Sequence, residues 1–224
     1  AERMALVSKM EETILVQGGR AELGSNLYQY GTIHPSGRQY LESFSKELFP
    51  EWVYEAKGVK LKKTIGMVHG ENTTLLQYEV LEAPGTFTLE LQPFLSVRGS
   101  HELVHANDVV DKEFFFEKNI FKTKLYDNTP DIFIHVPGGH YHHRPDWYLH
   151  YHYAVEKYRG LDFEEDLFTP GYFAISLKKG DVLGIILSTE NPEGKDATRL
   201  FKEEEKRKRK LLKDQPDDET LQQL

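Results

Sequence analysis

The stretch TFTLELQPFL, residues Thr86–Leu95, decides the fold class of this chain. Apolar and polar residues alternate in its first half, so that Phe87, Leu89 and Leu91 fall on one face of an extended strand. That period of two is what a half-buried antiparallel strand requires. The sequence therefore predicts a strand with one face on a hydrophobic core and the other face toward water.

Working outward, further runs of the same kind are separated by glycine and proline turn signals. Two hairpins are predicted, Trp52–Ala56 with Val59–Lys63 and Thr73–Leu81 with Thr86–Leu95, the latter turning at Ala83-Pro84-Gly85. The other predicted strands are Leu6–Val16, Phe121–Tyr126, Asp131–Val136, Trp147–Val155, Tyr172–Leu177 and Asp181–Ser188. Many short strands of this kind are typical of a β-sandwich or barrel, so the predicted fold class is all-β.

The last part of the chain has a different pattern. Ala197–Lys213 is charged and strongly helix-favouring, with Asp196 or Thr198 as a candidate cap. Because this segment has no apolar residue between Phe201 and Leu211, it predicts a solvated helix. We expect a β-sandwich domain over residues 1–195 and a helical linker over 196–224 that leads toward a catalytic domain, with a second helix starting at Asp217–Thr220.

Composition narrows the function. The 224 residues carry a net charge of -8, which argues against a nucleic-acid partner, and the basic run Lys206–Lys210 is explained by pairing with Glu203–Glu205. The absence of cysteine excludes disulfides and cysteine metal sites. No apolar run approaches the ~20 residues that cross a bilayer, and no signal peptide is visible. We expect a cytoplasmic protein without a cofactor or membrane partner.

Several segments, in order and spaced over nearly the whole chain, resemble the amino-terminal domain family of prokaryotic glycogen debranching enzymes. They are Leu6–Val16 (LVSKMEETILV), Glu22–Asn26 (ELGSN), Ile33–Phe44 (IHPSGRQYLESF), Val68–Thr74 (VHGENTT), Trp147-Tyr148, Arg159–Leu167 (RGLDFEEDL) and Thr169-Pro170-Gly171. The family's domain is expected to begin with a Gly-rich segment and an Arg-Tyr-His-Gly-Leu-like segment, and this sequence contains neither.

The resemblance implies a large antiparallel β-sandwich of the galactose-mutarotase-like, or supersandwich, type. It implies that an α/α toroid follows in the parent enzyme and hydrolyses the α-1,6 branch linkages of glycogen. The catalytic carboxylates of the family belong to that toroid, so the resemblance assigns no catalytic residue to this chain. The implied function is to assist α-glucan binding and to pack on the catalytic domain.

An aromatic stretch between Tyr141 and Tyr158 suggests where a glucan would bind. Tyr and Trp present a large apolar ring with a polar handle, which suits stacking on the C–H faces of sugars at a wet surface. The residues predicted to bind carbohydrate are Trp147, Tyr148, Tyr151, His142, His143, Asp146 and Arg159. Two other interpretations stay open: the aromatic residues divide between core and exterior, or they pack against the catalytic domain.

Histidines offer an alternative, a cupin-like metal site. His140 and His142, and likewise His150 and His152, are spaced by two and would share one face of a strand. Two such pairs on neighbouring strands would suit a divalent metal. The glutamate that a cupin needs shortly after its histidines is missing, and hydrogen bonding within a polar surface is the simpler explanation.

A stand-alone aldose mutarotase-like enzyme is the other alternative. It requires a histidine and a carboxylate in one cleft, for which His69 or His142 with Glu165 is the best pairing in the sequence. Against this, the four acids Asp162, Glu164, Glu165 and Asp166 predict a solvated loop in which one of them holds Arg159. Val68–Thr74 predicts a hairpin turn that bonds to its own backbone.

Overall fold

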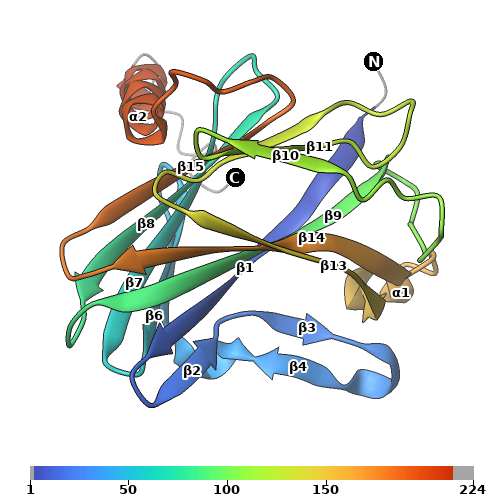
Figure 1. The fold of residues 1–224 in the computed structure, drawn as a ribbon, viewed down its shortest axis with the longest axis horizontal. Coiled ribbons are helices and arrows are strands. Elements are labelled where there is room, and N and C mark those ends of the chain that lie inside the picture. Colours follow the sequence, from blue (N-terminus) through green and yellow to red (C-terminus); the bar gives the residue numbers. More distant parts are fainter. Residues whose placement is uncertain (1–2, 214–224) are drawn as a thin grey trace.

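The computed structural model describes residues 3–213 and is an antiparallel β-sandwich (Figure 1). One sheet has five strands, in the order β13 (His140–His152), β14 (Glu164–Leu177), β9 (Phe87–Gly99), β1 (Met4–Val16) and β2 (Gly19–Glu22). The second has eight, in the order β10 (Phe114–Glu117), β11 (Ile120–Thr123), β12 (Ile132–His135), β15 (Val182–Ser188), β8 (Thr73–Glu82), β7 (Val59–Met67), β6 (Pro50–Ala56) and β5 (Leu41–Lys46). The predicted fold class is confirmed.

Shorter elements complete the described fold. A small hairpin joins β3 (Ser25–Leu27) to β4 (Ile33–Ser36), with the 3-10 turn η1 (Gln29–Gly31) at its tip and η2 (Gly37–Tyr40) after it. Two helices follow, α1 (Ala154–Tyr158) after β13 and α2 (Ala197–Lys213) after β15. No helix within residues 3–213 combines the length and the apolar character that crossing a membrane requires.

The main core lies between the two sheets, and it uses the face of β9 that the sequence predicted. Phe87 is 3% exposed and Leu89 and Leu91 are fully buried, where they meet Tyr78 and Ile185 from the opposite sheet. Burial of each such side chain contributes roughly 1.5–3 kcal/mol relative to exposure. The two layers are therefore held together by the residues that alternate along their strands.

One predicted hairpin is confirmed and the other is wrong. β6 and β7 pair from Glu51↔Thr64 to Ala56↔Val59 around Lys57 and Gly58, both at positive φ. β8 and β9 instead belong to different sheets, so the turn at Ala83-Pro84-Gly85 carries the chain across the sandwich. An alternating pattern specifies which face of a strand is buried, but it does not specify the neighbouring strand.

Two further expectations about the second half are corrected. The predicted strand Trp147–Val155 begins earlier, at His140, and ends at His152 before α1. The predicted solvated loop of acids is partly strand, because β14 begins at Glu164 and buries Glu165 and Asp166. These two carboxylates have partners from a distant loop, as described below.

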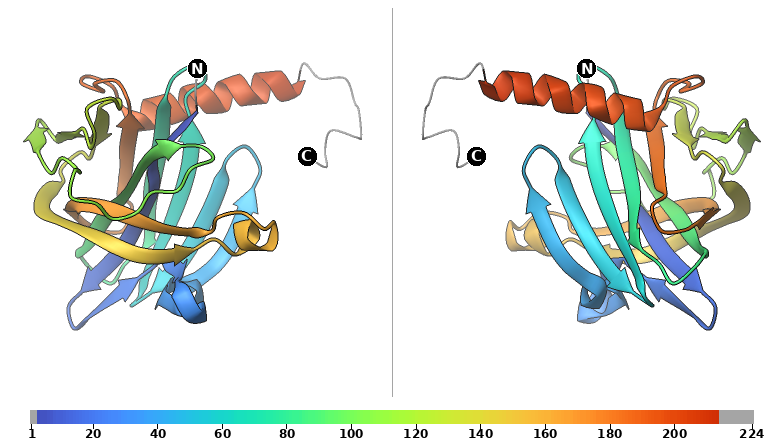
Figure 2. Two further views of the ribbon diagram at one scale, coloured as in Figure 1. Left: turned by 90° about the vertical axis from the view of Figure 1, so that its right-hand side faces the viewer. Right: turned by 90° about the vertical axis from the view of Figure 1, so that its left-hand side faces the viewer.

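The helix α2 is only half solvated, in contrast to its prediction. The predicted cap is confirmed, since the Asp196 carboxylate accepts the backbone N–H of Arg199 at 2.7 Å. Ala197, Leu200 and Phe201 are buried against Leu75 and Ile186 on the outer face of the eight-stranded sheet. Further along, Glu204 is 6% exposed and Lys208 donates to the Leu48 carbonyl at 2.7 Å, and only the C-terminal end of the helix extends beyond the strands (Figure 2). The predicted helix at Asp217–Thr220 lies outside the described residues.

Two glycines allow this close packing. A Cβ atom on Gly184 would lie 2.8 Å from the Cβ atom of Ala197, and one on Gly66 would lie 2.7 Å from the ring of Phe201. Both distances are shorter than van der Waals contact. The outer face of the eight-stranded sheet therefore has a notch, formed by Gly66 and Gly184, that fits the first turns of α2.

Candidate functional site

The predicted carbohydrate-binding residues of β13 lie on both faces of the five-stranded sheet, because neighbours such as Trp147 and Tyr148 alternate along the strand. The register with β14 shifts between His143 and Asp146 and again between Tyr148 and Tyr151. Trp147 points inward, where it lies half-buried against the main core with its ring 5.4 Å from that of Phe168. The indole N–H of Trp147 is buried and has no hydrogen-bond partner among the described residues.

Tyr148 and Tyr151 lie on the outer face of the same sheet. Tyr151 is 3% exposed, and its ring packs near those of Phe94 and Tyr28. The ammonium group of Lys9 lies 4.2 Å from the centre of the Tyr151 ring, a cation–π contact. The hydroxyl of Tyr148 accepts a hydrogen bond of 3.4 Å from the Gln92 amide. Burial raises the pKa of Tyr151, so its hydroxyl stays protonated.

The other four predicted residues are dispersed. The exposed His142 stacks on Tyr172 at 4.8 Å on the outer face, and His143 stacks on Phe114 at 4.6 Å near the edge of the core. The Asp146 carboxylate accepts the N–H of Trp147 at 2.9 Å, within the first bulge. Arg159 follows α1 and pairs with Glu156 at 3.4 Å, not with the acids of Asp162–Asp166 as predicted.

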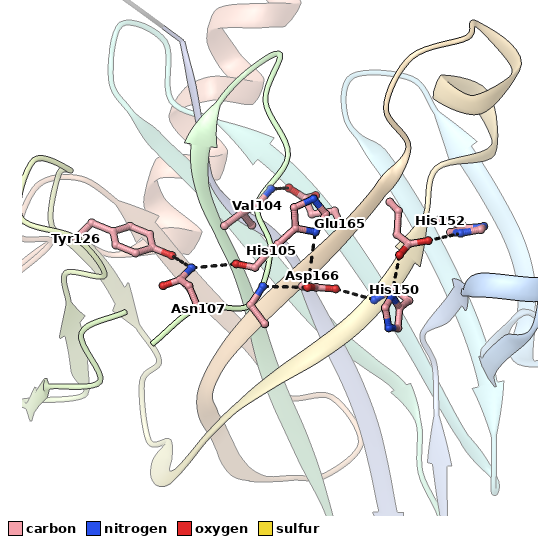
Figure 3. Close-up of polar contacts among 10 residues, drawn as sticks. Val104, His105, Asn107, Tyr126, His150, His152, Glu165 and Asp166 are labelled. Carbon is pink, nitrogen blue, oxygen red and sulfur yellow. Dashed lines mark hydrogen bonds and ion pairs between the residues drawn. The ribbon is translucent and has the colours of Figure 1, made fainter. Parts of the chain in front are cut away.

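The structure also assembles a buried carboxylate network that the sequence did not predict (Figure 3). Glu165, which is fully buried, binds the guanidinium of Arg98, the hydroxyl of Tyr153 and the backbone N–H of Val104 at 3.3 Å. Asp166 accepts the backbone N–H of Ala106 at 2.9 Å. Buried charges are tolerated where they are paired and hydrogen-bonded in this way. The network fastens the long loop after β9 to the start of β14.

The same network shapes the end of β13. His150 has a φ of +63°, and its backbone N–H donates to Asp166 at 2.8 Å, which stabilises the second bulge. The Glu164 carboxylate then bridges two rings, His150 Nδ1 at 2.7 Å and His152 Nε2 at 2.9 Å. Hydrogen bonds from both histidines hold the pKa of Glu164 below its usual value. Glu164 is therefore an acceptor and not a proton donor near neutral pH.

The four histidines of the cupin-like alternative do not meet. His140–His142 and His150–His152 lie on one strand, β13, at positions eight residues apart, a separation of roughly 25 Å at the rise of a strand. Within residues 3–213, no group of three or more histidine or carboxylate side chains could hold a metal ion. The alternative of a four-histidine metal site is wrong, because both pairs lie on one strand and its length separates them.

The pairs required by the mutarotase-like alternative do not form either. His142 faces Tyr172 on β14, seven residues from Glu165, which is roughly 20 Å along the strand. His69 lies in the β7–β8 turn of the other sheet, where its backbone N–H donates to Glu204 at 3.0 Å. That segment is a hairpin turn, as predicted, with Val68 N–H bonded to the Thr73 carbonyl at 3.0 Å.

Above the network lies an exposed apolar surface, which we call the α1 end. It consists of the end of β13, α1, the loop to β14 and the η1 tip of the β3–β4 hairpin, which lies against β13 (Figure 1). Tyr30 and Tyr158 are each more than 90% exposed. The other exposed apolar side chains here are Ile33, Leu149, Val155 and Leu161. Several exposed large apolar side chains on adjoining elements are a feature of interaction sites.

Four of the seven segments that carry the family resemblance lie at or next to the α1 end. Glu22–Asn26 and Ile33–Phe44 form and follow the β3–β4 hairpin, whereas Trp147-Tyr148 and Arg159–Leu167 lie more than 100 residues later, in β13 and around α1. An isolated bridge between Tyr28 and Tyr151 joins the two groups. The fold thus brings together what the sequence separates, at a polar and aromatic surface.

The two stacked antiparallel sheets define an all-β sandwich domain. Residues 1–183 match the family described as glycogen debranching enzyme N terminal, and the chain therefore belongs to that family. Among solved structures, the chain is similar to a bacterial glucoamylase complexed with acarbose, at 12% identity and a TM-score of 0.49. The match covers 90% of this chain and 31% of the glucoamylase chain. A search of curated proteins found no match.

Proposed function

We propose that this chain is the accessory amino-terminal domain of a cytoplasmic glycogen debranching enzyme, and that its α1 end faces the catalytic domain and helps to bind α-glucan. The observation that carries the proposal is the convergence of the family-like segments on a surface with exposed Tyr30 and Tyr158. In this proposal the catalytic domain of the parent chain cleaves glycogen, and the β-sandwich domain positions the substrate.

The direction in which the two helices point supports a catalytic domain as the partner. α1 and the C-terminal half of α2 project to the same side of the sandwich (Figure 2). Exposed apolar residues occur in both, Val155 and Tyr158 in α1 and Leu211 and Leu212 in α2. A single partner on that side would cover both sets of side chains.

The chemistry of the α1 end supports a glucan ligand. Exposed tyrosine rings can stack on sugar rings, and Arg159, Glu156 and His150 provide hydrogen-bonding groups around them. Of the other predicted residues, Tyr148 and His142 would extend the surface along β13, with Trp147 and Tyr151 supporting it from beneath. His143 and Asp146 lie at the first bulge of β13, farther from α1, so only a longer glucan would reach them.

Titration of the 224-residue chain with a maltooligosaccharide, followed by calorimetry, tests this assignment. We expect saturable binding that Tyr158→Ala weakens by about 2- to 10-fold, the equivalent of the ~0.5–1.5 kcal/mol of an aromatic contact. Phe115→Ala is the matched control, because Phe115 is an exposed aromatic residue on the distant strand β10. Equal weakening by both substitutions, or no binding at millimolar ligand, would refute direct glucan binding by the α1 end.

An activity assay tests the division of labour. The chain should release no glucose from a branched glucan, because its buried carboxylates are committed to Arg98 and to backbone groups. Sustained glucose release that survives further purification would contradict the assignment of catalysis to another domain.

A further inference from the structure

An open cleft separates the two sheets beside the first half of β1. Its volume is about 970 Å³, and it is lined on one side by Arg3–Met10 and on the other by inward side chains of β7, β8, β12 and β15. Ile65, Leu76 and Leu187 form much of the far wall. A cleft of this size and character falls in the range of binding sites, because interiors are otherwise closely packed.

All three methionines of the chain line this cleft: Met4, Met10 and Met67. Met67 is 62% exposed and Met4 is 40% exposed, although both lie beside the core. Methionine is flexible and polarizable, and it is frequent at apolar surfaces that adapt to a bound partner. The lining therefore has the character of a contact surface.

The cleft also runs along an unpaired strand edge. β1 pairs with β9 along nearly its whole length, but it pairs with β2 only from Thr13 to Val16. Among the residues that the structure describes, no strand pairs with the second edge of β1 from Met4 to Glu11. Every residue from Arg3 to Met10 lines the cleft, whereas an inner face alone would contribute every second residue. The cleft thus opens onto backbone groups as well as apolar side chains.

We propose that this cleft is a docking site for an extended polypeptide segment that adds to the free edge of β1, in line with β2. Its backbone would bond to β1, and its alternate side chains would fill the space between the sheets, a recognised mode of peptide binding. The unpaired edge of β1 spans eight residues, so the segment needs roughly eight residues at ~3.3 Å each.

Charge indicates the composition of the segment. The lining contains Arg3, Lys9 and Lys63, and none of the described lining residues is acidic. Lys9 is paired with Glu11 at 2.8 Å, and Lys63 is paired with Glu12 and also donates to the Met10 carbonyl at 3.3 Å. Arg3 lines the cleft as well. A segment with alternating apolar residues and neutral or acidic residues between them fits this lining, and a basic one does not.

The test uses the 224-residue chain and a labelled nine-residue peptide in which valine alternates with threonine and glutamate. We expect saturable binding and slower hydrogen exchange of the β1 amides between Met4 and Met10. A peptide with the same side chains but an N-methyl group on every backbone nitrogen should bind at least about 10-fold more weakly, because none of its nitrogens can donate to the edge of β1.

Two variants locate the site. Met67→Lys should weaken peptide binding at least about 10-fold, because it places a cation at the apolar wall, whereas Val109→Lys, at a 78% exposed position on another loop, should not. The proposal is overturned by equal binding of the methylated peptide, by unchanged binding of Met67→Lys, or by no binding at all. Sedimentation of the chain without peptide is the last measurement. A dimer in which the β1 amides are protected from hydrogen exchange would overturn the proposal, because a second copy of the chain would then occupy the edge.

Discussion

The docked half of α2 and the α1 end both lie outside the main core, and only the first is covered by another element. α2 packs Ala197, Leu200 and Phe201 into the notch of Gly66 and Gly184. The α1 end, in contrast, leaves Val155 and Tyr158 exposed although α1 is also helical. A helix with apolar residues is therefore buried only where the facing sheet has the shape to receive it.

What lies beneath each region also differs. The notch is apolar, and its contacts depend on shape. The α1 end lies on the carboxylate network of Glu165 and Asp166, whose partners are charged or backbone groups. A surface over a rigid polar network keeps its form while its apolar side chains stay free for a partner. The comparison predicts that changes beneath the α1 end are costly and changes upon it are cheap.

The largest expected effect follows from removing the cation of the network. Arg98→Met would leave the fully buried Glu165 carboxylate without its charge partner and should lower the free energy of unfolding by about 3–5 kcal/mol. Urea denaturation measures this. The double variant Arg98→Met, Glu165→Leu should recover much of the loss, because it removes both charges. A similar loss in the double variant would show that the charge pair is not the cause.

The next effect concerns the notch. Gly184→Val would place side-chain atoms where Ala197 lies and should lower the free energy of unfolding by about 1–3 kcal/mol, the usual cost of overpacking. Limited proteolysis within α2 should become faster at the same time. Gly85→Ala is the matched control, since a Cβ atom there would meet nothing within 4 Å and the φ is not positive. Equal sensitivity of the two variants would contradict the role of the notch.

These regions also show how far the sequence alone could lead. Alternation in Thr86–Leu95 predicted the buried face of β9, because that pattern is local. The partners of Glu165 and Asp166 in the loop after β9 lie 60 to 67 residues away in sequence, so adjacent acids gave the pattern of a solvated loop. The spacing of Ala197, Leu200 and Phe201 did contain a signal for docking, since positions i, i+3 and i+4 share one helical face.

The glycines that receive this helical face could not be recognised in the same way. Gly66 and Gly184 lie on β7 and β15, which flank β8, and only the fold places both of them beneath α2. Prediction of the candidate site from the sequence failed for a similar reason, because the positions of its residues depend on geometry that the sequence does not show. Neighbouring residues of β13 alternate between the two faces, which divides Trp147 from Tyr148, and the bulge between Tyr148 and Tyr151 places Tyr151 on the same face as Tyr148.

A smaller effect is expected on the surface of the α1 end. Tyr158→Ala removes a ring that is 92% exposed and should change the free energy of unfolding by no more than about 0.5 kcal/mol. Leu200→Ala in the docked half of α2 is the informative counterpart. Because Leu200 is buried, this substitution should lower the free energy of unfolding by about 2–5 kcal/mol. If the two substitutions cost the same in urea denaturation, the α1 end is not the free surface that we describe.

The smallest effect concerns pH, and it separates the two regions by the pH range in which each loses stability on acidification. Burial lowers the pKa of His135, which lies near Asp196 at the start of α2. The unfolded chain therefore binds a proton at this residue more readily, so its contribution to stability is complete above about pH 6.5 and is lost as the pH falls below that value. Glu164 at the α1 end has a lowered pKa, and its contribution persists until the pH falls below about 4.5.

The free energy of unfolding between pH 7.5 and pH 5.5 tests this difference. His135→Gln should flatten the loss of stability on acidification in that window, because the substituted side chain does not titrate, while Glu164→Gln should leave the slope there nearly unchanged. Below pH 4.5 the order should reverse, with Glu164→Gln giving the flatter curve. An unaltered slope in His135→Gln would mean that another group near the docked helix takes up the proton.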